Sequence, residues 1–355
     1  MSQQEAPVSG APAYAPPPAA RRKPWFLIGL LAFIVIGGAG WTAAWFYASG
    51  RAVQEIDRWM AAEAERGRSW SCADRQFGGF PFRFELICTE PTVTFTGPAG
   101  GSAKATRAHA VAQVWNPRHI IAEFDGPGVI SSPQAGEITA TWSLLQVSGV
   151  GRGNDLDRLS VAADDYALTQ GGTVFFGARH AEFHVRHTPG SDAATLDIAA
   201  GVKGATGVTT AAGGAAPIDG ALEMTATQVP EWRAVLAPAA RLQAWQAAGG
   251  RVKLLEARLS GGGGAMNATG EIGLDPERRP SGTINLTMAN APALMSALSA
   301  AGLMPAFMVN LAPALAVVGM PGTLDGAPAS TFPFTFRDGR ISLGMLPLGK
   351  IGPAF

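Results

Sequence analysis

Three histidines lie close together in the sequence, at His180, His184 and His187, and histidine is a common ligand of metal ions. The surrounding residues alternate apolar with polar, which predicts a strand with one apolar face that carries Phe183. Residues four positions apart on a strand are separated by about 13 Å, so His180 and His184 cannot share one ion. We therefore predict a solvated row of histidines, no metal ligand and no cofactor, with Phe183 as a candidate contact for an apolar ligand.

The motifs of common catalytic sites are missing from the sequence. It has no Gly-x-Ser-x-Gly elbow, no phosphate-binding Gly-x4-Gly-Lys-Ser/Thr loop and no His-Glu-x-x-His pair. The acidic pair Asp164-Asp165 has the residue type for general acid–base chemistry, but no base or nucleophile accompanies it. We predict no catalytic residues and a protein that is not an enzyme. The alternative is a hydrolase whose site assembles from scattered residues.

One segment is long and apolar enough to cross a membrane. Residues Trp25 to Tyr47 carry no charge and follow the basic cluster Arg21-Arg22-Lys23. About 20 apolar residues span the hydrocarbon core, whereas the apolar region of a signal peptide has about 7–15. We predict an uncleaved anchor in the bacterial inner membrane, with the N-terminus cytoplasmic because basic clusters stay inside and with the bulk of the chain in the periplasm.

The anchor divides the chain into four predicted parts: a disordered Ala/Pro-rich tail over 1–23, the anchor over 24–48, a juxtamembrane helix over 49–67 and a β-rich domain over 68–355. The formal net charge is zero and only 15% of the residues are charged. Nucleic-acid binding calls for a basic stripe, so we predict no nucleic-acid partner.

The two cysteines, Cys72 and Cys88, follow closely after the anchor. Gly78-Gly79 between them predicts a turn, and alternating apolar residues after it indicate a hairpin arm, namely Phe80, Phe82, Phe84 and Leu86. Because the predicted compartment is oxidising, we expect the pair to form a structural disulfide. A redox-active pair is disfavoured, since there is no Cys-x-x-Cys spacing.

Beyond Thr92 the chain predicts a mainly β (α+β) fold, a large antiparallel sheet whose short strands are separated by Gly-rich turns. The expected strands cover 105–115, 120–124, 137–148, 159–168, 173–186, 194–200, 221–227, 252–259, 265–274, 282–288 and 332–343. Two helical insertions are expected, over Pro230 to Gly249 and within Ala291 to Gly319. The second contains Pro305 and Pro313, which favours two short helices on the sheet over a second membrane span.

Three features together resemble one known family: the anchor, the cysteine pair around Gly79-Phe80-Pro81-Phe82-Arg83, and the closing segment from Phe334 to Gly344. The chain is similar to the alphaproteobacterial domain of unknown function 2125 family over nearly all of residues 25–355. The resemblance implies an inner-membrane envelope protein with no catalytic residues to carry over. A looser similarity in architecture links it to AsmA-like envelope proteins.

These observations favour a non-enzymatic envelope protein that binds or handles lipid or other apolar envelope material. Its expected partners are the lipid bilayer and either a lipid ligand or envelope proteins. The alternative is a structural scaffold or interaction module of an envelope complex. An apolar sheet face open to solvent favours the first function, and a closed core favours the second.

Overall fold

The computed structural model describes residues 25–96, 100–153, 155–207, 217–230, 238–304, 309 and 319–355. The predicted tail over 1–23 lies outside these residues. Internal contacts divide the chain into two units, Met1–Ala48 and Ser49–Phe355, and each is considered by itself.

The helix α1, Trp25–Glu65, begins in the first unit and ends in the second. It covers residues 25–48 of the predicted anchor and continues through residues 49–65 of the predicted juxtamembrane helix, which ends two residues earlier than expected. Its most apolar window has a mean hydropathy of 2.0, and among the described residues it is the one helix long and apolar enough to cross a membrane. Membrane anchors and signal sequences both meet these criteria.

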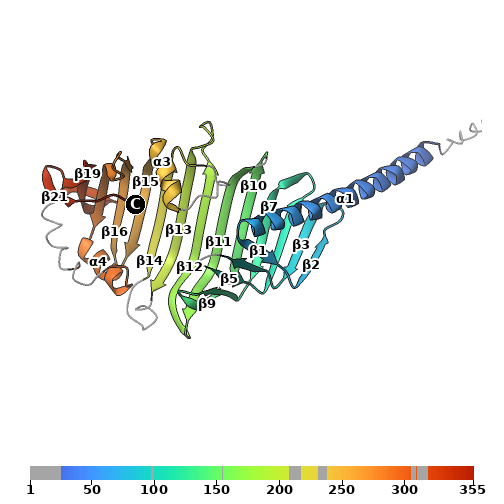
Figure 1. Ribbon diagram of the computed structural model, residues 1–355, viewed down its shortest axis with the longest axis horizontal. Helices are drawn as coiled ribbons and strands as arrows, with labels where there is room; N and C mark the ends of the chain where they lie inside the picture. The colour runs from blue at the N-terminus through green and yellow to red at the C-terminus, as the bar shows by residue number, and fades with distance from the viewer. Residues whose placement is uncertain are drawn as a thin grey trace, which may run out of the picture. The chain divides into compact units, whose positions relative to one another are not determined.

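The second unit is built from antiparallel strands, coloured from cyan to red in Figure 1. The first eleven are β1 Arg68–Ser71, β2 Asp74–Gly78, β3 Arg83–Thr89, β4 Thr92–Phe95, β5 Gly101–Lys104, β6 Arg107–Gln113, β7 Asn116–Asp125, β8 Gly128–Ser132, β9 Gly136–Thr141, β10 Leu144–Arg152 and β11 Asp155–Gln170. The others are β12 Thr173–His187, β13 Leu196–Gly207, β14 Ile218–Ala226, β15 Arg251–Gly261, β16 Gly264–Leu274, β17 Pro280–Ala289, β18 Met320–Leu324, β19 Ala327–Arg337, β20 Arg340–Leu343 and β21 Leu346–Lys350.

Most of these strands form one continuous sheet, which we call the main sheet. Its strand order is β2-β3-β6-β7-β10-β11-β12-β13-β14-β15-β16-β17-β19. On the outer side of β19, its first half pairs with β18 and its second half pairs with β20. The strand β21 then pairs with β20. The mainly antiparallel β fold expected from the sequence is confirmed.

A second layer branches from β11. The early part of β11 pairs with β10, whereas residues 167–169 near its end pair with β9. From β9 the pairing continues through β8, β5 and β4 to β1. The strands that precede β11 in the sequence are therefore divided between the main sheet and this second layer.

Two short helices follow the middle of the sheet in the sequence, α3 Pro238–Ala247 and α4 Ala291–Ala300. The most buried cluster of the second unit lies where α4 packs on β16 and its neighbours. Its centre is formed by Leu294, which is fully buried, together with Phe332 and Ile218. The helix α4 thus covers the sheet near the C-terminal end of the chain.

Several expected boundaries need correction. The strand expected over 137–148 is two strands, because the chain leaves β9 in the second layer and enters β10 in the main sheet at Trp142 and Ser143. The strand expected over 332–343 is also two strands, separated by Asp338 and Gly339, which both have positive φ. The strands β1, β4, β5, β8, β18 and β21 were not predicted, since each has only four or five residues.

The described helices cover part of the two expected insertions. The helix α3 is described over Pro238–Ala247, Pro230 is described and is not helical, and residues 231–237 lie outside the description. The helix α4 ends at Ala300, and residues 305–308 and 310–318 of the second expected insertion also lie outside it.

Candidate functional site

The main sheet has one apolar face, and its register shows this directly. Cross-strand partners lie on the same face of a sheet, so a chain of such partners marks one row across the strands. One row is apolar from β2 to β19: Phe77, Leu86, Ala110, Ala122, Val147, Val161, Phe183, Ala200, Leu222, Ala257, Ala268, Leu286 and Phe332. The next row on this face, two positions along each strand, is also apolar from Phe84 to Leu343 and includes Val185.

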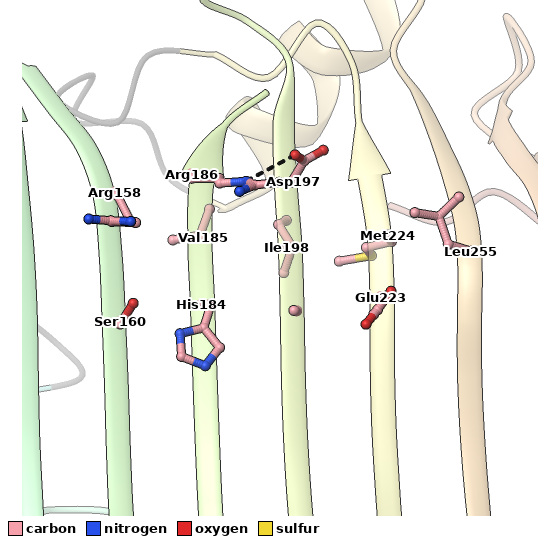
Figure 2. A pocket seen from close by; sticks show the side chains of 11 residues that line it. Arg158, Ser160, His184, Val185, Arg186, Asp197, Ile198, Glu223, Met224 and Leu255 are labelled. Carbon is pink, nitrogen blue, oxygen red and sulfur yellow. Dashed lines mark hydrogen bonds and ion pairs between the residues drawn. The ribbon is translucent and has the colours of Figure 1, made fainter. Parts of the chain in front are cut away.

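The opposite face is polar. One of its rows reads Arg158, Arg186, Asp197, Thr225, Lys253, Glu271, Thr283, Thr335 and Ser342. Figure 2 shows Ser160 on β11, His184 on β12 and Glu223 on β14, with the ion pair of Arg186 and Asp197 joining β12 to β13. Because polar side chains cover one face and apolar side chains the other, the two faces offer different chemistry.

The polar face brings one hydroxyl and one imidazole together, because His119 Nε2 lies 3.0 Å from Ser148 Oγ. Ser160 and His184 are cross-strand partners, but no hydrogen bond joins them in the described part of the chain. His184 Nε2 instead lies 3.2 Å from Glu182 Oε2, and His180 Nδ1 lies 2.6 Å from Asp164 Oδ1. These are pairs of the kind found on solvated faces.

The contacts of His180 with Asp164 and of His184 with Glu182 shift the pKa values of His180 and Glu182. The hydrogen bond to Asp164 raises the pKa of His180, and the hydrogen bond from His184 lowers the pKa of Glu182. Among the described residues, no three His, Cys, Asp or Glu side chains gather where they could hold a metal ion. His180 and His184 are placed on the polar face, as their alternation with Phe183 indicates.

On the apolar face, the second layer and the main sheet line a cavity of about 490 Å³ that is open to solvent, which we call the apolar cavity. The main sheet contributes apolar residues of four neighbouring strands, among them Phe124, Leu145, Val161 and Phe183. The second layer and the turns next to it contribute Trp70, Val93, Ala103, Ile130, Ala140 and Trp142, and β11 adds Tyr166. Such a volume lies within the range of about 300–1,000 Å³ typical of small-molecule sites.

The polar atoms of the cavity wall are few. Trp142 Nε1 donates to the backbone oxygen of Phe124 at 2.6 Å, and burial raises the pKa of Tyr166. The buried Nε1 of Trp70 has no hydrogen-bond acceptor among the described residues. The charged residues that line the cavity, Lys104 and Glu182, are both exposed to solvent. The interior of the cavity is therefore suited to a ligand with few polar groups.

Close approach of the chain shapes one wall of the cavity. A Cβ atom on Gly128 would lie 2.7 Å from the ring of Trp142, so a larger residue there would displace the ring. Glycine at this position lets the indole pack flat against the start of β8, where it forms part of the cavity wall.

Phe183, the residue expected to contact an apolar ligand, lies on the wall of this cavity with 40% of its surface exposed. Val185, two residues further along the same strand, has only 3% of its surface exposed. The sequence reasoning missed Trp70 because its strand β1 has only four residues, and it missed Trp142 because this residue lies in the link between β9 and β10. Clustered tryptophans beside a predicted sheet were the available signal.

The beginning of the second unit is held together by charge and by the cysteines. Glu63 in α1 accepts hydrogen bonds from Arg66 and Arg68, and the bond from Arg68 lowers the pKa of Glu63. The sulfur atoms of Cys72 and Cys88 lie 1.94 Å apart, at disulfide distance, as the sequence predicts.

The hairpin near the cysteines differs in detail from the expected one. Its turn includes Gly79, whose φ of 100° suits glycine, but the second arm begins only at Arg83. Phe80 and Phe82 therefore lie in the turn and are exposed, because Pro81 between them has no N–H to donate to a ladder.

The fold and the site define a class of protein: a candidate membrane-spanning helix followed by an antiparallel sheet with one apolar face and a cavity on that face. Residues 45–352 match the family described as "Uncharacterized protein conserved in bacteria (DUF2125)", and the chain belongs to this family. No curated protein and no solved structure matches the chain. The architectural similarity to AsmA-like envelope proteins stays a prediction.

Proposed function

We propose that this protein binds the hydrocarbon chains of lipids in the apolar cavity, as a non-enzymatic component of the bacterial envelope. The observation that carries the proposal is the cavity itself. It has a volume of about 490 Å³ and an apolar wall, and it lies on a sheet face without charges in its central rows. Burial of hydrocarbon contributes about 0.8 kcal/mol per methylene, so a cavity of this kind favours chains over polar ligands.

The distribution of burial supports this function. In a protein that only forms a closed core, both ends and the middle of an apolar face are covered. Here α4 buries the face near Phe332, which is 1% exposed, and Val185 in the middle of the sheet is 3% exposed, whereas Phe183 on the same strand keeps 40% of its surface exposed. An aromatic side chain that is half open on a cavity wall is available to a ligand.

A non-enzymatic role is supported by the pairing of the polar side chains. His180 pairs with Asp164 and Glu182, and His184 pairs with Glu182. Of these residues Glu182 lines the apolar cavity, where it is exposed to solvent. Catalytic groups usually sit in clefts where burial and neighbours shift their pKa values strongly.

We propose that α1 anchors the protein in the inner membrane with residues 49–355 in the periplasm. The basic cluster Arg21-Arg22-Lys23 supports this orientation through the positive-inside rule, and the disulfide-distance pair of Cys72 and Cys88 suits an oxidising compartment. Protease added to intact spheroplasts is expected to digest the periplasmic part and to spare an N-terminal tag. Loss of the tag, or a mature chain that begins near Ser49, would contradict the anchor.

Binding is tested with the full chain held in an amphipathic polymer and titrated with a fluorescent fatty acid. The proposal predicts saturable binding, detected by energy transfer from tryptophans near the cavity such as Trp70 and Trp142. Fluorescence that rises only as it does with polymer alone would contradict the proposal.

A scaffold function is the second candidate, and the edge strand β21 favours it. In the described residues β21 pairs with β20 alone, so its other edge is free. Met345 beside it is 99% exposed, and Leu346 and Leu348 are about half exposed. An exposed apolar edge is a place where another chain adds a strand. Cross-linking from Leu348 to a protein rather than to lipid would favour this function.

A further inference from the structure

A shallow apolar groove adjoins the apolar cavity on the same face of the main sheet. It lies over β13, β14 and β15 and has a volume of about 370 Å³. Its floor is formed by small and aliphatic residues, with Ala200, Leu222 and Ala257 in the central row and Val202, Gly220 and Leu259 in the row beside it. Arg258 also lines the groove, and it is paired with Asp325. We call this surface the apolar groove.

The register of β12 and β13 makes the cavity and the groove continuous. Phe183 and Ala181 line the cavity, and their cross-strand partners, Ala200 and Val202, line the groove. Residues paired in this way have Cβ atoms about 4.5–5.5 Å apart, with no strand between them. A chain that leaves the cavity past Phe183 therefore lies directly on the groove.

The groove ends where α4 begins to cover the sheet. Leu259 at its far side packs against the buried cluster around Leu294. The carbonyl oxygen of Ala301, just after α4, lies 2.5 Å from where a Cβ would stand on Gly207 of β13. The helix and the residue after it thus form an end wall, and the site does not continue freely over β16 and β17.

The length of the combined site exceeds that of one acyl chain. From β7 to β15 the main sheet has six inter-strand spacings of about 4.8 Å, which gives about 29 Å. The hydrocarbon core of a bilayer is about 30 Å thick, so a chain from one leaflet covers about 15 Å. One chain fills about half of the site.

From this geometry we propose that the cavity and the groove are two halves of one site for a lipid with two acyl chains, one chain in each half. The inference rests on the proposed function and extends it from hydrocarbon in general to diacyl lipids. The central row has no hydrogen-bonding side chain from Val161 to Ala257, so the occupant of the groove is itself without polar groups along its length. A partner protein would bring polar groups and anchor residues that such a floor cannot satisfy.

The test compares a single-chain fatty acid with a diacyl phosphatidylglycerol as competitors for a fluorescent fatty acid, using the full chain in an amphipathic polymer. The variant Leu222→Asp places a charge in the groove. Its matched control is Ala199→Asp, which places the same charge on the polar face between the cross-strand partners His184 and Glu223.

The proposal predicts that Leu222→Asp weakens the diacyl lipid at least tenfold and leaves the fatty acid within about twofold, while Ala199→Asp changes neither. The variant Leu222→Trp, which fills the groove without a charge, is expected to act in the same way if the charged variant does not fold. Unchanged diacyl affinity in a folded groove variant would overturn the two-chain site and leave the proposed function standing. Failure of the unaltered protein to bind either lipid would instead overturn the proposed function.

Discussion

Replacement of Phe183 by aspartate tests the apolar cavity most sharply, because this residue connects the cavity with the groove. The phenyl ring lies on the cavity wall with 40% of its surface exposed, so about 60% is removed from solvent. Full burial of a phenylalanine side chain contributes about 1.5–3 kcal/mol, so Phe183→Asp is expected to lower the free energy of unfolding by about 1–2 kcal/mol. This loss is small compared with the free energy of unfolding of a typical domain, which is about 5–15 kcal/mol, so the variant is expected to fold.

The effect on binding is expected to be larger than the effect on folding. A bound hydrocarbon chain would remove water from the new carboxylate without offering a hydrogen bond. Desolvation of even a neutral polar group costs about 1–3 kcal/mol in proteins, and a charge costs more. With about 1.4 kcal/mol for each factor of ten, a loss of at least 2 kcal/mol lowers the affinity at least about 30-fold.

The assay is the titration with fluorescent fatty acid, accompanied by the thermal midpoint of each variant. The matched control is Ser160→Asp, because Ser160 is the cross-strand partner of His184 on the polar face and the change in net charge is the same. We expect the control to bind like the unaltered protein. Equal affinity in Phe183→Asp and Ser160→Asp, with both proteins folded, would refute the placement of the ligand in the cavity.

Three further predictions concern stability, measured by denaturant unfolding of the full chain. Replacing both Cys72 and Cys88 by serine should lower the free energy of unfolding by about 3 kcal/mol, and identical unfolding under reducing and oxidising conditions would show that no bridge contributes. Leu294→Ala should cost about 2–5 kcal/mol because this side chain of α4 is fully buried, and a cost below 1 kcal/mol would mean that the helix does not pack on the sheet as described. Glu63→Gln should cost about 1 kcal/mol at neutral pH, since Arg66 and Arg68 both keep access to water. Because folding lowers the pKa of Glu63, its contribution is present above the ordinary carboxyl range and is lost as the pH falls through the folded value, so the variant and the parent should converge in acid.

The alternation around Phe183 made the apolar face predictable. Apolar and polar residues alternate from His180 to Arg186, so the side of the sheet on which Phe183 lies follows from the period of two. The partners of Phe183 across the sheet, such as Val161 and Ala200, could not be named in advance. Register depends on turns and on irregularities such as the bulge near Leu254, which a single sequence does not specify.

The cavity was beyond prediction for a related reason. It exists because β11 pairs with β10 along one part and with β9 near its end, so that two layers diverge from one strand. The break at Trp142 that allows this change of layer is stabilised by the hydrogen bond from its indole to Phe124, a residue 18 positions away. Local propensity across 137–148 favours one uninterrupted strand, and the tertiary contact decides otherwise.

The most direct test of the central claim is mass spectrometry of lipid extracted from the full chain after purification in a mild detergent. The account predicts a lipid with two acyl chains in roughly stoichiometric amount, retained by Ser160→Asp and strongly depleted in Phe183→Asp. Equal lipid in the two variants, or no lipid above that carried by an unrelated protein with one membrane-spanning helix, would contradict it.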